Sequence, residues 1–169
     1  SCPNVKSGLI VGEQPGETLA LLEVIRPLTE KPLIVKLTPN CSDPAAVARA
    51  AADGGADAVS LINTLRATGL DPTTLDPWLG ATSGGLSGPA IRSIALDQVR
   101  RVTAEVSIPV IGMGGIETGA DALGFLALGA SAVAVGTASF RDPAAAERIR
   151  AELAAELAER GFDRLPAVE

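Results

Sequence analysis

Short apolar runs alternate with longer amphipathic stretches along the chain. The runs are rich in Val, Ile and Leu, and the amphipathic stretches repeat their apolar residues every three or four positions. This alternation predicts strands that are each followed by a helix. We predict strands at residues 32–37, 57–63, 109–113 and 131–136. We predict helices at residues 17–28, 42–55, 89–106, 118–129 and 142–161.

Capping signals delimit two of the predicted helices. A side-chain oxygen before the first turn, a proline within it and a glycine after the last turn are typical of helix boundaries. These residues are Ser42 or Asp43, Pro44 and Gly54 for the helix at 42–55, and Asp142, Pro143 and Gly161 for the helix at 142–161. Residues 66–88 form a long polar stretch with several glycines and prolines, which predicts a connecting segment.

Strands that alternate with helices predict a parallel α/β sheet, and the continuous apolar runs are typical of strands covered on both faces. The polar and glycine-rich segments follow the carboxyl ends of the strands, as in a (β/α)8 TIM barrel. A complete barrel needs about 250 residues, whereas this chain has 169. We therefore predict a single domain over 1–169, formed by the C-terminal half of a barrel (about four βα units) from a longer chain. A doubly wound open sheet is the structural alternative.

Composition narrows the chemistry that the chain can perform. The net charge is −6 without a basic run, which argues against nucleic acid or an anionic membrane surface as a partner. No apolar run approaches the roughly 20 residues that span a bilayer. The absence of histidine excludes a Ser-His-Asp triad within the chain, and two cysteines are too few for a zinc site of their own. Acid–base chemistry would therefore fall to Cys, Lys, Asp or Glu.

Polar residues at the ends of two predicted strands are candidate ligands. Lys36 lies near the end of the first strand, where it is either an exposed lysine or a cation placed against an anionic group. Asn63 and Thr64 end the second strand. An asparagine amide can both donate to and accept from the amide or imide edge of a ligand, although strand-end turn residues are the alternative.

Two glycine-rich strand ends predict an anion site. Gly114 and Gly115 end one strand and Gly136 ends the next, and both segments then enter a predicted helix. Glycine lets backbone N–H groups approach an anion near a helix N-terminus, and barrel phosphate sites are commonly built from two consecutive loops of this kind. A third glycine-rich segment at 84–90 is either a flexible connector or part of the same site.

Three further residues have no assigned role from composition alone. Cys2 and Cys41 are either small buried hydrophobes or reactive thiols, and a thiolate can act as a base or a nucleophile. Trp78, in the connecting segment, is more typical of a packing anchor than of a ligand contact.

Six segments of the chain resemble the dihydroorotate dehydrogenase family, in that family's order and at similar spacing. They are "SCPNV", "PLIVKLTPN", "LINTL", "GGLSGPAI", "IPVIGMGGI" and "AVAVGTASF". The resemblance covers residues 1–169 and is to the class 1, NAD-linked type. It implies a flavoprotein oxidoreductase of pyrimidine biosynthesis that oxidises dihydroorotate to orotate in the cytoplasm, with FMN as its cofactor.

The resemblance also implies roles for individual residues. Cys2 would be the catalytic base that removes the C5 proton of dihydroorotate while a hydride passes from C6 to N5 of FMN. The residues implied to bind the pyrimidine are Asn4, Asn63 and Thr64. The residues implied to bind FMN are Lys36, Ile62, Gly88, Gly114, Gly115, Gly136 and Thr137, of which the last four would lie mostly at its phosphate.

The family has more than a hundred residues before the point that matches Ser1, including further strands and a further lysine. The resemblance therefore implies that this segment is inactive alone. It also implies a homo-oligomer and a separate electron-transfer subunit carrying FAD and a [2Fe–2S] cluster, which two cysteines could not hold.

Two other functions remain open. The pyrimidine-reducing domain of dihydropyrimidine dehydrogenases is similar, but usually has Cys-Pro-His where this chain has Cys2, Pro3 and Asn4. A non-catalytic half-barrel that binds phosphate is the alternative from another class, although it would leave two open sheet edges.

Overall fold

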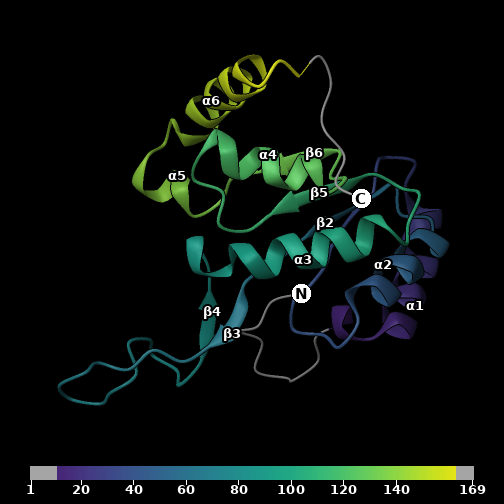
Figure 1. The fold of residues 1–169 in the computed structure, drawn as a ribbon. Coiled ribbons are helices and arrows are strands. Elements are labelled where there is room, and N and C mark those ends of the chain that lie inside the picture. Colours follow the sequence, from purple (N-terminus) through teal and green to yellow (C-terminus); the bar gives the residue numbers. More distant parts are fainter. Residues whose placement is uncertain (1–10, 163–169) are drawn as a thin grey trace.

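The structure is a computed structural model, and it describes residues 11–162 (Figure 1). Cys2 and Asn4 lie outside the described residues. The predicted strands are confirmed in shorter form as β1 (Ile34–Lys36), β2 (Ala58–Leu61), β5 (Val110–Met113) and β6 (Ala132–Ala134). They form one parallel sheet in the order β1-β2-β5-β6, which is also their order in the sequence.

One helix precedes β1, and the others follow strands of this sheet in the sequence. The helices are α1 (Pro15–Ile25), α2 (Pro44–Asp53), α3 (Arg92–Thr103), α4 (Gly119–Ala127), the short α5 (Ala138–Arg141) and α6 (Ala145–Glu159). Short 3₁₀ turns cover Val11–Glu13, Arg26–Leu28 and Pro89–Ile91. The helices predicted at 17–28 and 89–106 are thus each an α-helix joined to a 3₁₀ turn. No helix within residues 11–162 is long and apolar enough to cross a membrane.

The longer helices form one continuous layer. Each packs against the next, with α1 on α2, α2 on α3, α3 on α4 and α4 on α6 (Figure 1). A doubly wound sheet instead reverses its strand order at a switch point and carries helices on both faces. The described part of the chain therefore has the arrangement of a singly wound βα layer.

The register of the strands gives the sheet two different faces, a core face that packs against the helices and an opposite face. Val35 pairs with Val59, and Val59 pairs with Val110, so these side chains share one face of the sheet. Val59 and Val110 are buried in the core between sheet and helices. On the opposite face Ile34 is 54% exposed, and Lys36 beside it is exposed as well. The prediction that each strand is covered on both faces is therefore wrong for β1 in the described residues.

Helix boundaries follow the predicted caps in part. The Asp43 side chain accepts a hydrogen bond from the Ala45 amide, which confirms it as the cap of α2. Gly161 has a φ of 64° after α6, a conformation that glycine adopts without a side-chain clash, and the amide of Phe162 bonds back to the carbonyl of Leu157.

The predicted start of the last helix is wrong. Asp142 and Pro143 precede α6 rather than begin it, and the cap position is Ala144. The Asp142 side chain accepts from the Ala144 amide and pairs with Arg148. Asp142 therefore closes a turn between α5 and α6 instead of capping the helix directly.

The connecting segment contains an antiparallel hairpin that the sequence did not predict. β3 (Leu65–Ala67) pairs with β4 (Gly84–Leu86), and the residues between them project from the body of the molecule (Figure 1). Trp78 packs against Gly69 within this projection but is 71% exposed, so it is not a core anchor in the described structure.

The packing of α4 against α6 generates a stability prediction. A Cβ at Gly119 would clash with the backbone of Glu152 and Leu153. Gly119→Ala should therefore lower the free energy of unfolding by about 2 kcal/mol or more, since backbone atoms cannot move aside cheaply. Urea denaturation of the purified protein measures the change.

Gly124 in the same helix provides the matched control. A Cβ at Gly124 would lie 3.6 Å from Leu96 Cδ2, an ordinary contact. Gly124→Ala should stabilise the protein by roughly 0.5–1 kcal/mol through helix propensity. Equal destabilisation by both substitutions would show that the close contact between α4 and α6 is not the cause.

Candidate active site

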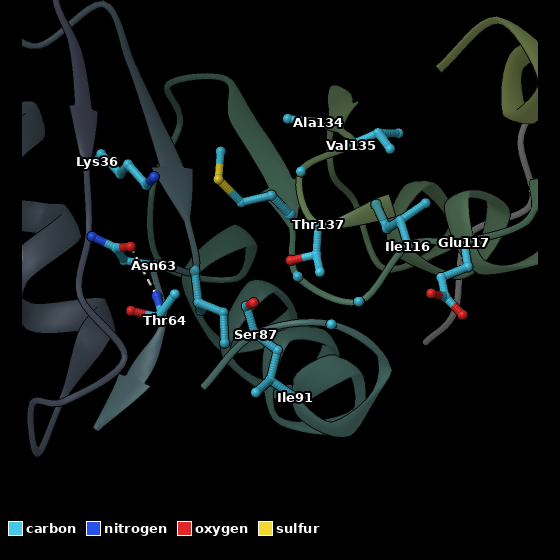
Figure 2. Close-up of a pocket in the computed structure, with 16 residues that line it drawn as sticks. Lys36, Asn63, Thr64, Ser87, Ile91, Ile116, Glu117, Ala134, Val135 and Thr137 are labelled. Atoms are coloured by element: carbon cyan, nitrogen blue, oxygen red, sulfur yellow. Dashed lines mark hydrogen bonds between the residues drawn. The ribbon is translucent and has the colours of Figure 1, made fainter. Parts of the chain in front are cut away.

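A pocket of about 250 Å³ lies at the carboxyl ends of the four parallel strands (Figure 2). Its walls come from the end of β1, from the segment that joins β2 to β3, from the turn before α3, and from the loops after β5 and β6. Because the strands are parallel and adjacent, their carboxyl ends lie at one edge of the sheet. Segments from across the chain are thereby brought together in one cavity.

All nine of the predicted ligand residues that the structure describes line this pocket. They are Lys36, Ile62, Asn63, Thr64, Gly88, Gly114, Gly115, Gly136 and Thr137. Cys2 and Asn4 lie outside the described residues, so their positions relative to the pocket stay predictions. The structure thus brings the nine together, and their individual roles stay predictions.

Polar side chains gather at one end of the pocket. Figure 2 shows Lys36, Asn63 and Thr64 on the side opposite the loop of Ile116 and Glu117. The Asn63 side-chain oxygen accepts a hydrogen bond from the Thr64 amide at 2.8 Å, which fixes the orientation of the Asn63 amide. This end offers an ammonium group, a carboxamide and a hydroxyl.

Glycine backbone forms the other end. Gly114 has a φ of 127° and Gly115 a φ of 74°, and a Cβ at Gly115 would lie 2.8 Å from both the Arg92 Cβ and the Gly88 carbonyl oxygen. Only glycine fits these positions without strain. Within residues 11–162, the amides of Gly114, Gly115, Gly136 and Thr137 donate to no other group. These amides are available to a ligand.

The N-terminus of α4 is already occupied by carboxylates of the chain itself. The Thr118 amide donates to Asp121 at 3.1 Å, and the Gly119 amide donates to Glu152 at 2.8 Å. The Thr118 hydroxyl in turn accepts from the Asp121 amide, which completes a capping box. The expectation that α4 presents its N-terminus to an anion is therefore not met, and amides of the preceding loops are the donors at this end.

Several lining residues had no predicted role. Ile91, Met113 and Val135 supply apolar surface, and Ser87 adds a hydroxyl. Met113 lies at the last position of β5, so strand alternation could have identified it as a pocket residue. No local sequence pattern identifies Glu117 as a pocket residue. Its position depends on residues distant in the sequence, because its carboxylate pairs with Arg141 of α5 and its carbonyl accepts from Arg148 of α6.

Cys41 is separate from this pocket. Its thiol donates to the Thr38 carbonyl at 3.4 Å, and the half-buried side chain packs against the core. Burial, with the Asp43 carboxylate nearby, raises the pKa of the Cys41 thiol, which keeps it protonated at neutral pH. Cys41 therefore fits the description of a small core residue. No cluster of three or more metal-ligating side chains occurs among residues 11–162.

The fold and the pocket define a parallel βα protein with a pocket at the carboxyl edge of its sheet, lined by glycine backbone at one end and by polar side chains at the other. The sequence profile of the dihydroorotate dehydrogenase family matches residues 1–157, and the chain belongs to that family.

Individual relatives agree with this assignment. The chain is 50% identical over 164 residues to the protein named dihydroorotate dehydrogenase B (NAD(+)), catalytic subunit, from a Geobacter species, covering 96% of this chain and 54% of that protein. The protein of the same name from Citrifermentans bemidjiense is 52% identical over 154 residues, covering 90% and 50%. The chain thus spans about half the length of the curated relatives that it matches.

A solved structure shares the fold. The crystal structure of DHODH from Eimeria tenella in complex with ferulenol superposes with a TM-score of 0.77 at 27% sequence identity. The match covers 98% of this chain and 51% of the Eimeria chain.

The contact between Glu152 and the start of α4 generates a pH prediction. Arg148 and, secondarily, the Gly119 amide lower the pKa of the Glu152 carboxyl. A group whose pKa is lowered by folding contributes stability that is present at neutral pH and is lost as the pH falls through the lowered pKa. Glu152→Gln should therefore be less stable than the wild type at pH 7, with the difference shrinking below the ordinary glutamate range. Urea unfolding of both proteins, at pH 7 and at a pH below the ordinary glutamate range, measures this difference in stability.

Glu147→Gln is the control for this experiment, because Glu147 pairs with Arg150 on the exposed surface of α6 alone. Its effect at pH 7 should be smaller, since exposed pairs contribute little. An equal loss for both variants, or a Glu152→Gln effect that does not change with pH, would contradict the assigned role of Glu152.

Proposed function

We propose that the protein is an FMN-dependent oxidoreductase that oxidises dihydroorotate to orotate in pyrimidine biosynthesis. The observation that carries the proposal is the pocket itself, in which nine residues implied by the family resemblance lie together at one sheet edge. Family membership and the names of the relatives support the substrate class.

The pocket fits FMN at both of its ends. The unbonded amides of Gly114, Gly115, Gly136 and Thr137 suit a phosphate, because backbone donors can surround an anion where no side chain intervenes. The apolar surface between the ends suits a flat ring, and the ammonium group of Lys36 suits its electron-rich edge. FMN, when bound, supplies the hydride acceptor of the reaction.

The protein's own residues would bind the substrate and move its proton. Asn63 and Thr64, with Asn4, would hydrogen-bond the polar edge of the pyrimidine, and the carboxamide of Asn63 is already fixed by the Thr64 amide. Cys2 would be the base, its thiolate taking the C5 proton of dihydroorotate and becoming a thiol. Cys41 is not an alternative base, because it lies outside the pocket and its pKa is raised.

We also propose that the sheet is part of a single (β/α)8 barrel domain that includes residues 1–169. The singly wound order of the strands supports this, as do the exposed side chain of Ile34 and an apolar hollow of about 270 Å³ between α1 and β1. Further strands and helices of the barrel would cover these surfaces. The segment alone should then be inactive.

The names of the relatives support a partner subunit. The words "catalytic subunit" in the names of the relatives imply a second subunit, and the same names specify NAD⁺. We propose that electrons leave through a subunit carrying FAD and a [2Fe–2S] cluster. A homo-oligomer and a cytoplasmic location also stay predictions.

An assay of the protein expressed from its complete gene tests the proposed function. We expect bound FMN, oxidation of dihydroorotate and no turnover of uracil. Reduction of uracil without activity on dihydroorotate would instead support the dihydropyrimidine dehydrogenase alternative, and absence of bound flavin would contradict both. Cys2→Ala should retain FMN and lose most of its turnover.

Gly136 tests the anion end of the pocket. A Cβ at Gly136 would meet no atom within 4 Å, so Gly136→Leu should fold normally and place its side chain into free space beside the pocket loops. We expect at least a tenfold weaker affinity for FMN, measured by quenching of flavin fluorescence, with unchanged urea unfolding.

Gly80→Leu is the matched control, because a Cβ at Gly80 also meets no atom within 4 Å and Gly80 lies in the projecting hairpin segment away from the pocket. It should retain normal affinity for FMN. Normal FMN affinity in Gly136→Leu would remove the loop after β6 from the proposed cofactor site.

A further inference from the structure

We propose that Asn40 is a positioning residue that holds Asn63 and Thr64 in place for the substrate, an inference that rests on the proposed function. Asn40 lies in the loop after β1 and does not line the pocket. Its side-chain amide nevertheless hydrogen-bonds the segment that carries Asn63 and Thr64, two of the three predicted pyrimidine ligands.

The side-chain carboxamide of Asn40 makes the hydrogen bonds that the backbone of a neighbouring strand would make. Its Nδ2 donates to the Thr64 carbonyl at 3.0 Å, and its Oδ1 accepts from the Arg66 amide at 2.8 Å. These two groups flank Leu65, and they are the groups through which a parallel neighbour would pair with that residue. Since β4 pairs with the other edge of β3, the strand has partners on both sides.

This contact continues the sheet where its backbone pairing ends. The Leu37 amide donates to the Ser60 carbonyl at 2.8 Å, and the Asn63 amide donates to the Leu37 carbonyl at 3.2 Å. Beyond that point the backbones of the two segments make no hydrogen bond with each other within residues 11–162, and the Asn40 side chain joins them instead. Asn63 and Thr64 are thus both held to the segment after β1. Asn63 is held by its backbone bond to Leu37, and Thr64 by the bond of its carbonyl to the Asn40 side chain.

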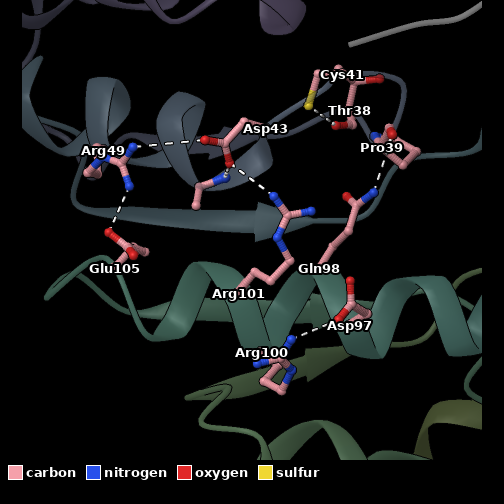
Figure 3. Close-up of polar contacts among 11 residues, drawn as sticks. Thr38, Pro39, Cys41, Asp43, Arg49, Asp97, Gln98, Arg100, Arg101 and Glu105 are labelled. Carbon is pink, nitrogen blue, oxygen red and sulfur yellow. Dashed lines mark hydrogen bonds and ion pairs between the residues drawn. The ribbon is translucent and has the colours of Figure 1, made fainter.

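The loop that carries Asn40 is itself held firmly. Thr38 is fully buried, and its hydroxyl accepts from both the Asn40 Nδ2 at 3.1 Å and the Asn40 amide at 3.2 Å. From the helix side, the buried Gln98 of α3 donates to the Pro39 carbonyl at 3.3 Å (Figure 3). The Asn40 carboxamide therefore has one orientation that satisfies all its partners, and an amide is the group that supplies both donor and acceptor.

Three variants in the complete enzyme test this role. Asn40→Ala removes both bonds to β3, whereas Asn40→Asp keeps an acceptor for the Arg66 amide and loses the donor to the Thr64 carbonyl. Thr103→Val is the control, because it removes a side-chain bond to the Leu128 carbonyl (2.8 Å) at the opposite end of the sheet.

We expect both Asn40 variants to raise the KM for dihydroorotate and the Kd of orotate at least tenfold, with a smaller change in kcat. Orotate binding is measured by titrating the flavin absorbance. FMN content should stay near that of the wild type, because the hydrogen bonds of Asn40 within residues 11–162 go to Thr38, Thr64 and Arg66 and not to the loops of Gly115 or Gly136. Thr103→Val should leave KM and Kd unchanged.

Hydrogen exchange supplies a readout that does not depend on activity. Exchange of the Arg66 amide should accelerate at least tenfold in Asn40→Ala, and should stay slow in Asn40→Asp and Thr103→Val. Faster exchange in Asn40→Ala with unchanged KM and Kd would overturn the positioning role, and unchanged exchange would overturn the tie to β3. If Asn40→Ala does not fold, Asn40→Asp decides by the same KM and Kd criterion.

Failure of the proposed function can be distinguished from failure of the proposed role of Asn40. A wild-type enzyme that does not oxidise dihydroorotate would overturn that function and with it a role toward this substrate. The tie between Asn40 and β3 would then stand or fall on the exchange of the Arg66 amide alone.

Discussion

Parallel pairing of β1, β2, β5 and β6 in one register is the constraint on which the pocket depends. The pairs Lys36 with Ser60, Leu61 with Gly112, and Met113 with Ala134 set which residue stands last on each strand. A shift of one residue would turn every side chain to the other face of the sheet. The buried valines of the core face therefore determine that Lys36 and Met113 face the pocket.

Local signals were sufficient to predict the strands and most helices. Valine- and isoleucine-rich runs identified the strands, and Asp43 identified the start of α2, because an aspartate cap acts on amides two or three residues away. Glycines at strand ends located one side of the pocket for a similar reason. The conformations of Gly114 and Gly115 are properties of their own backbone, although the close contacts that require glycine at Gly115 come from Arg92 and Gly88.

Features that depend on distant contacts could not be predicted in this way. The hairpin of β3 and β4 uses short strands, two of whose six positions are Gly84 and Gly85, and one of its edges is completed by the side chain of Asn40. At the start of α4, the amide of Gly119 is taken by Glu152, which is 33 positions away in the sequence. The glycine-then-helix pattern pointed to the amides of Gly114 and Gly115, which make no hydrogen bond within residues 11–162, but it could not show that the first amides of α4 are taken by Asp121 and Glu152.

Charge at the anion end of the pocket is balanced by pairing rather than by an excess of cations. Two carboxylates lie close to the glycine loop, and each is held by an arginine: Asp121 by Arg92 at 2.7 Å, and Glu117 by Arg141. Arg92 also donates to the Gly115 carbonyl at 3.3 Å, so one guanidinium both neutralises a carboxylate and fixes the loop. Because each carboxylate is paired with an arginine, neither would repel the proposed phosphate as an unpaired charge would, and the unbonded amides of the loops could donate to it directly.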